Sequence, residues 1–263
     1  MHVVVPLKQV FDPNTPIVQL RISADGRSLE LPSGLSPVMN GYDANAVEAA
    51  IALKEKHGGS VTVLSVGNET SKNALRRAIG MGADRAVHIM GPVGLASDST
   101  QVAALLTAAI RKLPPTELVL CGRQASDTDA GQVPLLLAAA LGFASAVPVK
   151  SIVPDGNDGF VVERIADGIT QRLRVPTPAV VGVSNEINKP RVASLKGVMQ
   201  AKKAEIPTWT PEELGLADLE PSLTLLRVSF PKAPDTRAEV IEGASAPAAG
   251  AALADRLRQE GMI

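Results

Sequence analysis

The chain has 263 residues, a formal net charge of −1 and 45% hydrophobic residues, enough for one large α/β domain with appendages or one domain plus a small second one. The balanced charge argues against a dedicated nucleic-acid binder, and no apolar run approaches the ~18 residues that a membrane-spanning helix needs. The single cysteine, Cys121, excludes an internal disulfide framework, and with the lack of a secretory-type leader after Met1 it predicts a cytoplasmic protein.

The first two thirds of the chain alternate strand and helix patterns. Strands are expected at 3–5, 61–64, 86–89, 118–120 and about 146–152, with a hairpin at 17–31. Helices are expected from the capping residue Asp43 to Gly58, and over 70–79, 98–112 and 135–141. Strands separated by helices predict an α/β fold with a mostly parallel, doubly wound sheet, whose ligands bind beyond the carboxyl ends of the strands.

The pattern changes after residue 152. A second hairpin is expected over 161–175 and an apolar strand over 179–183. The basic segment 185–203 has no continuous core pattern and is expected to be a loop within a domain spanning 1–204. Residues 205–263 are expected to form a C-terminal arm that packs on a partner, with a strand at 223–230, a linker at 243–250 and a helix at 251–258.

The chemical motifs narrow the possible functions. No zinc-type Cys/His cluster, G-x-S-x-G elbow or Walker motif occurs, so no metal site and no catalytic residues of a hydrolase or kinase are expected. Aromatic residues make up only 2% of the chain. Any adenine ring would therefore be held by backbone groups and aliphatic side chains.

The segment 121–133 is the strongest candidate ligand loop, because it leaves an apolar strand and enters a helix near Asp129–Gln132. The N–H groups at a helix N-terminus suit a phosphate. Arg123 could neutralise phosphate charge, Gly131 lets the backbone come close, and the Gln132 side chain can donate a hydrogen bond. An equally good interpretation is a well-capped helix with Asp127 or Asp129 as N-cap. Pro6 and Val66 lie at two other strand ends, and Asn40 precedes the first core helix. Each is weak evidence alone, since Asn40, for example, could simply hold a turn.

The basic stretch 189–203 is the second candidate. Leu195, Val198 and Met199 among cations suit a docking surface, in which an apolar anchor fills a pocket and charges steer the encounter. The plainer interpretation is a solvated loop. Nucleic-acid binding is a third, weakened by the lack of aromatic residues for stacking.

Several segments closely resemble the β-subunit signature of electron transfer flavoproteins. The resemblance runs from residue 1 to about 215, and it is carried mainly by 162–168, 172–181 and 185–203, supported by 8–12, 46–54, 80–85 and Gln124–Asp127.

This resemblance implies a β-subunit that pairs with an α-subunit holding the working FAD. It implies an adenine nucleotide, AMP or a second FAD, at Pro6, Asn40, Val66 and the Asp127–Val133 loop. Electrons would come from flavin dehydrogenases of the acyl-CoA dehydrogenase type, as in fatty acid oxidation, and leave to a quinone reductase or another acceptor.

The resemblance also assigns residues at two further places. Leu195, with Lys196 and Met199 beside it, corresponds to the recognition loop that anchors the dehydrogenase. Glu163 corresponds to a glutamate near the partner's flavin.

One departure from the family pattern bears on the nucleotide. AMP-binding members tend to carry Asn-Gln-Thr-Gly and electron-bifurcating members Thr-Ala-Gln-Val-Gly-Pro, whereas this chain has Ala130-Gly131-Gln132-Val133-Pro134. The missing glycine favours AMP slightly over a second FAD. A more distant alternative, a stand-alone adenine-nucleotide-binding protein of the stress type, would explain residues 1–150 but neither the basic segment nor the tail.

Overall fold

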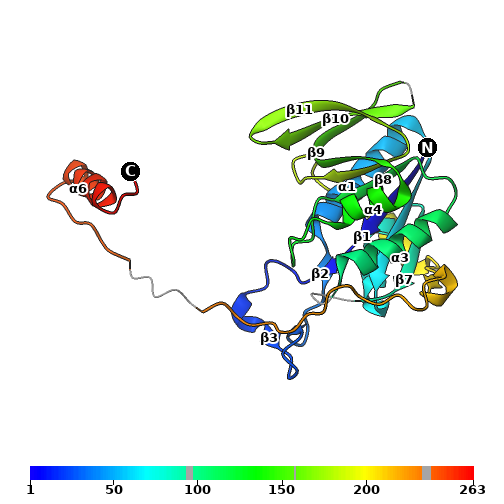
Figure 1. The fold of residues 1–263 in the computed structure, drawn as a ribbon, viewed down its shortest axis with the longest axis horizontal. Helices are drawn as coiled ribbons and strands as arrows, with labels where there is room; N and C mark the ends of the chain where they lie inside the picture. The colour runs from blue at the N-terminus through cyan, green and yellow to red at the C-terminus, as the bar shows by residue number, and fades with distance from the viewer. Residues whose placement is uncertain (93–96, 157, 233–237) are drawn as a thin grey trace. The chain divides into compact units, whose positions relative to one another are not determined.

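The computed structural model describes residues 1–263 except 93–96, 157 and 233–237, and the chain divides into two compact units, Met1–Val228 and Ser229–Ile263. The first unit is built on a sheet with the order β11-β10-β9-β12-β8-β1-β6-β7-β13 (Figure 1). These strands are β1 (His2–Leu7), β6 (Ser60–Gly67), β7 (Arg85–Met90), β8 (Leu118–Gly122), β9 (Ala144–Pro154), β10 (Gly159–Ala166), β11 (Ile169–Pro176), β12 (Ala179–Val183) and β13 (Thr208–Trp209).

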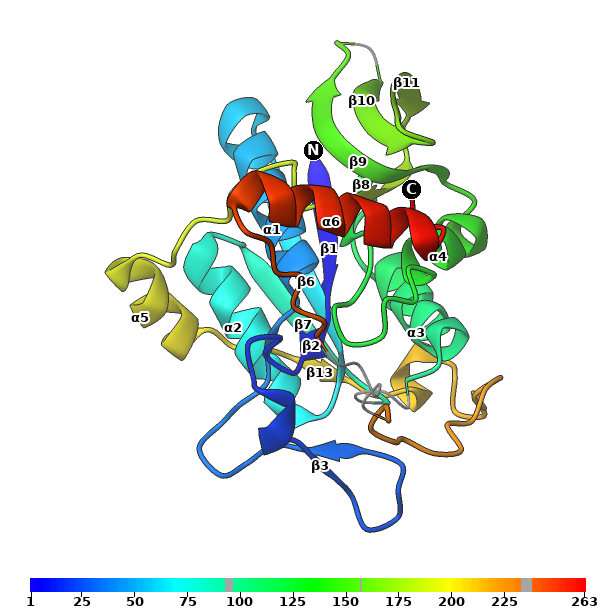
Figure 2. The ribbon, with the colours of Figure 1, turned by 90° about the vertical axis from the view of Figure 1, so that its left-hand side faces the viewer.

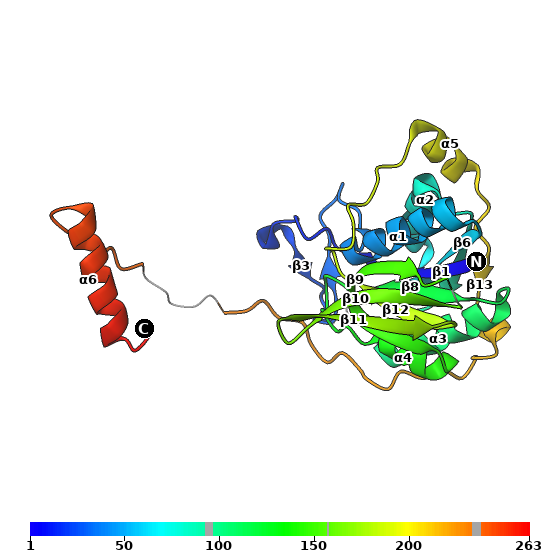
Figure 3. The same cartoon turned by 90° about the horizontal axis from the view of Figure 1, so that it is seen from above.

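Helices cover both faces of the parallel part of this sheet (Figure 3). Helices α1 (Gly41–His57) and α2 (Lys72–Met81) pack on one face, and α3 (Ser99–Lys112) and α4 (Val133–Leu141) on the other. Because both faces are covered, β1, β8 and β12 are buried along almost their whole length, as their unbroken apolar runs indicate.

The sheet reverses its winding at β1, which pairs in parallel with β6 on one side and with β8 on the other. The carboxyl ends of these strands therefore meet at a topological switch point, where open α/β sheets bind their ligands. The predicted fold class, a mostly parallel doubly wound α/β protein with added hairpins, is confirmed. At one edge β9 pairs in parallel with β12, and β10 and β11 then extend the sheet as an antiparallel hairpin.

The short strands outside the main sheet form two small pairs. Strands β2 (Gln9–Val10) and β5 (Val38–Met39) are antiparallel, as are β3 (Arg21–Ile22) and β4 (Leu29–Glu30). The latter pair is the centre of the hairpin predicted over 17–31.

Several local predictions are wrong. The N-cap position of α1 is Asn40 rather than Asp43, because the Asp43 carboxylate accepts a hydrogen bond from the Lys8 backbone N–H. The segment predicted as a loop over 185–203 contains helix α5 (Leu195–Lys203), capped by Ser194. Residues 223–230 form no strand, although the Val228 N–H donates to the Gly26 carbonyl oxygen.

The predicted boundary at 204/205 lies inside the first unit. Strand β13 pairs with β7, and Trp209, Leu214, Leu216 and Leu219 pack against the α3–α4 core cluster. The boundary therefore falls after Val228. The second unit contains helix α6 (Ala246–Gln259), longer than the helix predicted over 251–258, and its packing on a partner stays a prediction. Within the described residues, no helix has the length and apolarity to cross a membrane.

Candidate functional site

A cavity of about 320 Å³ opens at the switch point, at the carboxyl ends of β1, β6 and β8. The ends of the three strands supply Pro6–Lys8, Val66–Gly67 and Cys121–Gly122, and the start of α1 and the loop before α4 complete much of the wall. Its volume lies near the lower end of the ~300–1,000 Å³ typical of small-molecule sites. The location is the one that the predicted topology indicates.

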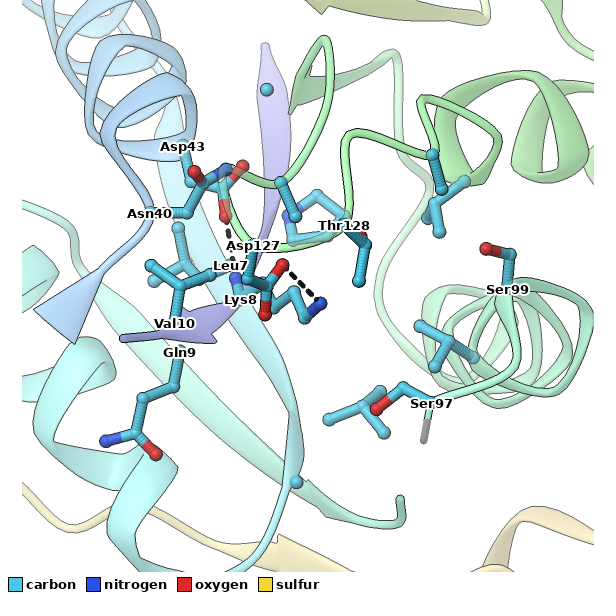
Figure 4. A pocket seen from close by; sticks show the side chains of 18 of the residues that line it. Leu7, Lys8, Gln9, Val10, Asn40, Asp43, Ser97, Ser99, Asp127 and Thr128 are labelled. Carbon is cyan, nitrogen blue, oxygen red and sulfur yellow. Dashed lines mark hydrogen bonds and ion pairs between the residues drawn. The ribbon is translucent and has the colours of Figure 1, made fainter. Parts of the chain in front are cut away.

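Two of the residues that line this cavity form an ion pair (Figure 4). The Lys8 Nζ donates to Asp127 Oδ1 at 2.8 Å, with 27% of the Lys8 side chain and 6% of the Asp127 side chain exposed. Lys8 directly follows β1, and Asp127 lies in the loop after β8. The pair therefore joins two strand ends and leaves the ammonium partly open to a ligand.

A buried carboxyl, Asp43, lies behind this pair in the first turn of α1. Its Oδ2 accepts the Lys8 backbone N–H at 2.7 Å. Burial raises the pKa of Asp43 to about 7, against the opposing effect of hydrogen bonds from the Lys8 and Gly122 backbone and from Asn40. A Cβ at position 122 would lie 2.3 Å from Asp43 Oδ1, so glycine is required there.

Asn40 holds the loop that follows β8. Its Nδ2 donates to the Gln124 carbonyl oxygen at 2.8 Å, and its Oδ1 accepts from the Ser126 N–H at 3.2 Å. The Gln124 Nε2 in turn donates to Asp129 Oδ1 at 2.7 Å. The amide of Asn40 thus has the turn-holding role that was one of its two interpretations.

Helix α4 begins at Val133 with Gln132 as N-cap and no side-chain cap, so the alternative interpretation with Asp127 or Asp129 as N-cap is wrong. Before it, the backbone has positive φ at Asp129 (49°) and Gly131 (62°). These turns direct the chain along the cavity wall, while the first-turn N–H groups stay without side-chain partners. Such groups can bind an anion, except at Pro134, which has no N–H.

The structure brings together seven of the eight residues predicted to bind the nucleotide. The residues that line the cavity are Pro6, Asn40, Val66, Asp127, Gly131, Gln132 and Val133. Arg123 is not among them. Its guanidinium lies 5.3 Å from the centroid of the Tyr42 ring, and its Nε donates to Gln124 Oε1. That geometry favours a role in holding the loop.

Other cavity residues escaped the sequence prediction, chiefly Lys8, Asp43 and Ser99. Lys8 immediately follows the first strand, which was the available signal. A lysine in that place is usually solvated, and its partner Asp127 is 119 positions away.

A second surface of interest is formed by α5, which packs on α2 (Figure 2). The side chains of Leu195 and Met199 are 80% and 56% exposed, and Lys196 is exposed beside them. The three residues predicted to dock a partner therefore share the accessible side of one helix.

Glu163 lies elsewhere, on β10, opposite Arg172 of β11 and Ser151 of β9. It is half-buried and does not line the cavity. Among the residues that the structure describes, no group of three His, Cys, Asp or Glu side chains could hold a metal ion.

A doubly wound sheet with a ligand-sized cavity at its switch point defines a class of α/β binding proteins. Within that class, the profile of the electron transfer flavoprotein domain matches residues 33–214, more than half of the chain. Together with the relatives described next, this match shows that the chain belongs to the β-subunit family of the electron transfer flavoproteins.

Full-length relatives support this assignment. The electron transfer flavoprotein subunit beta of Dictyostelium discoideum is 34% identical over 237 residues, covering 88% of this chain and 89% of that protein. The subunit beta of Bradyrhizobium diazoefficiens is 35% identical over 234 residues, covering 88% and 90%. Protein FixA of Azorhizobium caulinodans is 32% identical over 250 residues, covering 91% and 86%.

Proposed function

We propose that this chain is an electron carrier subunit that pairs with an α-subunit, binds AMP in the switch-point cavity and docks a flavin dehydrogenase at α5. The FAD of the α-subunit would supply the redox chemistry of the complex. Family membership supports the pairing, and the two surfaces described above support the division of roles. The electrons would leave to a quinone reductase or another acceptor.

The charge of the cavity is the observation that carries the choice of AMP. Among the lining residues that the structure describes, Lys8 is the only cation, and it already pairs with Asp127. With Asp43 also in the wall, the site holds more carboxyl groups than cations. One phosphate can be bound by Lys8 and the first-turn N–H groups of α4, whereas a diphosphate would bring more charge than these groups neutralise.

The residues present also fit an adenosine. Pro6 and Val66 offer apolar side chains and backbone groups at neighbouring strand ends, and Gly131 brings the backbone close without a side chain. In this role AMP is a structural ligand, and the residues of the cavity orient it and exclude water.

A second FAD, as in an electron-bifurcating β-subunit, is the competing proposal. Its support is the Gln132-Val133 pair, which lies in the cavity wall and matches the bifurcating pattern. The nucleotide content of the purified heterodimer, released by denaturation and separated by chromatography, distinguishes the two. One FAD and one AMP per heterodimer would support our proposal, and two FAD without AMP would overturn it.

Docking at α5 is tested by Leu195→Ala in the heterodimer. We expect a clear rise in the KM for the heterodimer in reduction by an acyl-CoA dehydrogenase, with its thermal stability unchanged. Val18→Ala, which truncates a side chain that is 88% exposed in the hairpin over 17–31, is the matched control. An unchanged KM in Leu195→Ala would remove α5 as the docking surface.

A further inference from the structure

The segment that leads into α5 is anchored to α1 through one residue, Arg191. Its backbone N–H and Nε donate to Glu48 Oε2 at 3.0 and 2.8 Å, and one terminal nitrogen donates to Glu48 Oε1 at 3.0 Å. The same guanidinium donates to both oxygens of Glu55, at 2.6 and 3.0 Å. Two carboxylates of one helix thus hold a single arginine that lies 136 or more positions away in the chain.

This arrangement depends on the shape of the guanidinium. Its planar set of donors can serve two carboxylates at once, whereas the ammonium of a lysine cannot reproduce that geometry. The Arg191 and Glu48 side chains are 34% and 13% exposed, so the pair is shielded in part from solvent. The hydrogen bonds from Arg191 lower the pKa of Glu55, and the two glutamates raise the pKa of Arg191.

Further contacts fix the segment before and after Arg191. The Asn45 Nδ2 donates to the carbonyl oxygen and to Oδ1 of Asn188 at 2.8 and 3.0 Å, and the Asn188 Nδ2 donates to the Asn45 carbonyl oxygen at 3.0 Å. Helix α5 approaches α2 so closely that a Cβ on Gly197 would lie 2.2 Å from the Gly80 carbonyl oxygen. At the far end, Arg76 donates to the carbonyl oxygens of Ala201 and Ala204.

Three large apolar side chains of this region stay more than half exposed. Val192, Leu195 and Met199 are 92%, 80% and 56% exposed, while the buried residues of α5 are Gly197 and Ala201. The helix is therefore held by small residues and by hydrogen bonds, which leaves its apolar anchors free. A surface fixed before binding loses less conformational freedom when a partner docks.

We propose that Arg191 is a positioning residue for docking, which presents Leu195 and Met199 in a fixed arrangement to the flavin dehydrogenase by clamping the preceding segment onto Glu48 and Glu55. This inference rests on the proposed docking at α5. Arg191 acts through the conformation of the segment and makes no contact with the partner.

The test compares two ways of breaking the same clamp in the intact heterodimer. Arg191→Met removes the cation, and the double variant Glu48→Gln/Glu55→Gln removes its partners while leaving the arginine in place. We expect both to raise the KM for the heterodimer about tenfold in reduction by an acyl-CoA dehydrogenase, with kcat unchanged. Hydrogen exchange of the amides in 189–194 should become faster in both.

Lys54→Met is the matched control, because Lys54 lies on the same helix as Glu48 and Glu55 but its ammonium binds Asp84 and the Gly82 carbonyl oxygen instead of Arg191. Its KM should match that of the unmodified heterodimer. If Arg191→Met fails to assemble with the α-subunit, Arg191→Lys takes its place, with Glu55→Gln in place of the double variant.

The outcomes separate the two levels of inference. A KM rise in Arg191→Met but not in the glutamate variant would mean that Arg191 contacts the dehydrogenase directly, which overturns the positioning role. If Leu195→Ala raises KM and neither clamp variant does, the result contradicts the positioning role of Arg191 but still supports docking at α5. If Leu195→Ala is also without effect, the proposed docking itself is wrong, and the role of Arg191 falls with it.

Discussion

Lys8 joins three parts of the cavity through three different groups. Its N–H donates to Asp43, its carbonyl oxygen accepts the Asn40 N–H at 3.0 Å, and its ammonium pairs with Asp127. The first two contacts fasten the end of β1 to the start of α1, and the third fastens both to the loop after β8. Only the third depends on the lysine side chain, so the side chain can be removed while the backbone contacts stay.

Replacement of this side chain should affect ligand binding more than folding. In Lys8→Met, the affinity of the nucleotide-stripped heterodimer for AMP should fall roughly tenfold to a hundredfold, because a hydrogen bond to a charged group contributes about 1.5–3 kcal/mol. Titration calorimetry measures the change. Lys72→Met, which breaks an ion pair with Glu69 outside the cavity wall, should bind AMP normally. An unchanged affinity in Lys8→Met would exclude Lys8 as the phosphate ligand.

Asp43 should give the free energy of unfolding a characteristic pH dependence. Its pKa is about 7 in the folded chain against an ordinary 3.8, so between these values the folded state binds the proton more strongly than the unfolded state does. The contribution of this carboxyl to the free energy of unfolding therefore decreases as the pH rises from about 4 to about 7, by at most about 1.4 kcal/mol per pH unit.

Urea unfolding at several pH values, for the unmodified chain and for Asp43→Asn, isolates this contribution. The difference in free energy of unfolding, variant minus unmodified, should increase between pH 5 and pH 7 and then level off. A difference that is constant across this range would show that Asp43 is already ionised in the folded chain at pH 5.

At the scale of the elements, the close contact of α5 with α2 makes Gly197 sensitive to substitution. Gly197→Ala places a methyl group 2.2 Å from the Gly80 carbonyl oxygen, so α5 must move. We expect a loss of about 1–3 kcal/mol in the free energy of unfolding, together with a raised KM for the dehydrogenase. Gly250→Ala in α6, where the added methyl meets nothing within 4 Å, serves as the control and should not destabilise the chain. Unchanged stability in Gly197→Ala would contradict the close packing.

The same helix shows why part of the structure escaped prediction. The core strands were predictable because their apolar runs are buried on both faces. Helix α5 was not, because it buries Gly197 and Ala201 and exposes Leu195 and Met199, which inverts the usual hydrophobic pattern. Residues 223–230 alternate like a strand, yet Leu223 and Leu226 are 69% and 79% exposed and no strand edge pairs with them in the described structure.

The candidate site was predictable in its place but not in its internal contacts. The switch point follows from strand order, and it brings together Pro6, Val66 and Gln132. The N-cap residue of α1 could not be predicted from the sequence. Asp43 is a residue type that suits an N-cap position, but its carboxylate instead accepts a hydrogen bond from the Lys8 backbone N–H. Such a choice is made by tertiary contacts rather than by local propensity.

At the scale of the whole molecule, the second unit carries exposed apolar side chains. Val240, Leu253, Met262 and Ile263 are 46–78% exposed within the described chain. Within this unit, Arg256 forms surface ion pairs with Glu239 and with Glu260. Exposed apolar groups on a small appended unit are consistent with the predicted packing on an α-subunit.

Truncation after Val228 tests that role. The shortened chain should keep the unfolding transition of the first unit, because β13 and the residues that pack behind it are retained. Its affinity for the α-subunit, measured by sedimentation or surface binding, should fall by about tenfold or more. Full-length affinity in the truncated chain would show that residues 229–263 do not contribute to the heterodimer.

The chain also contains a natural probe of its own motions. Cys121 is its only thiol, lies in the cavity wall and is 3% exposed, and burial raises its pKa, so the reactive thiolate is scarce in the closed state. A thiol reagent can therefore reach the sulfur only when the switch point opens. With one tryptophan and one tyrosine, the chain offers few fluorescent signals. The rate of alkylation of Cys121 would instead measure how often the cavity opens, and its decrease on ligand addition would measure how strongly a bound ligand suppresses that opening.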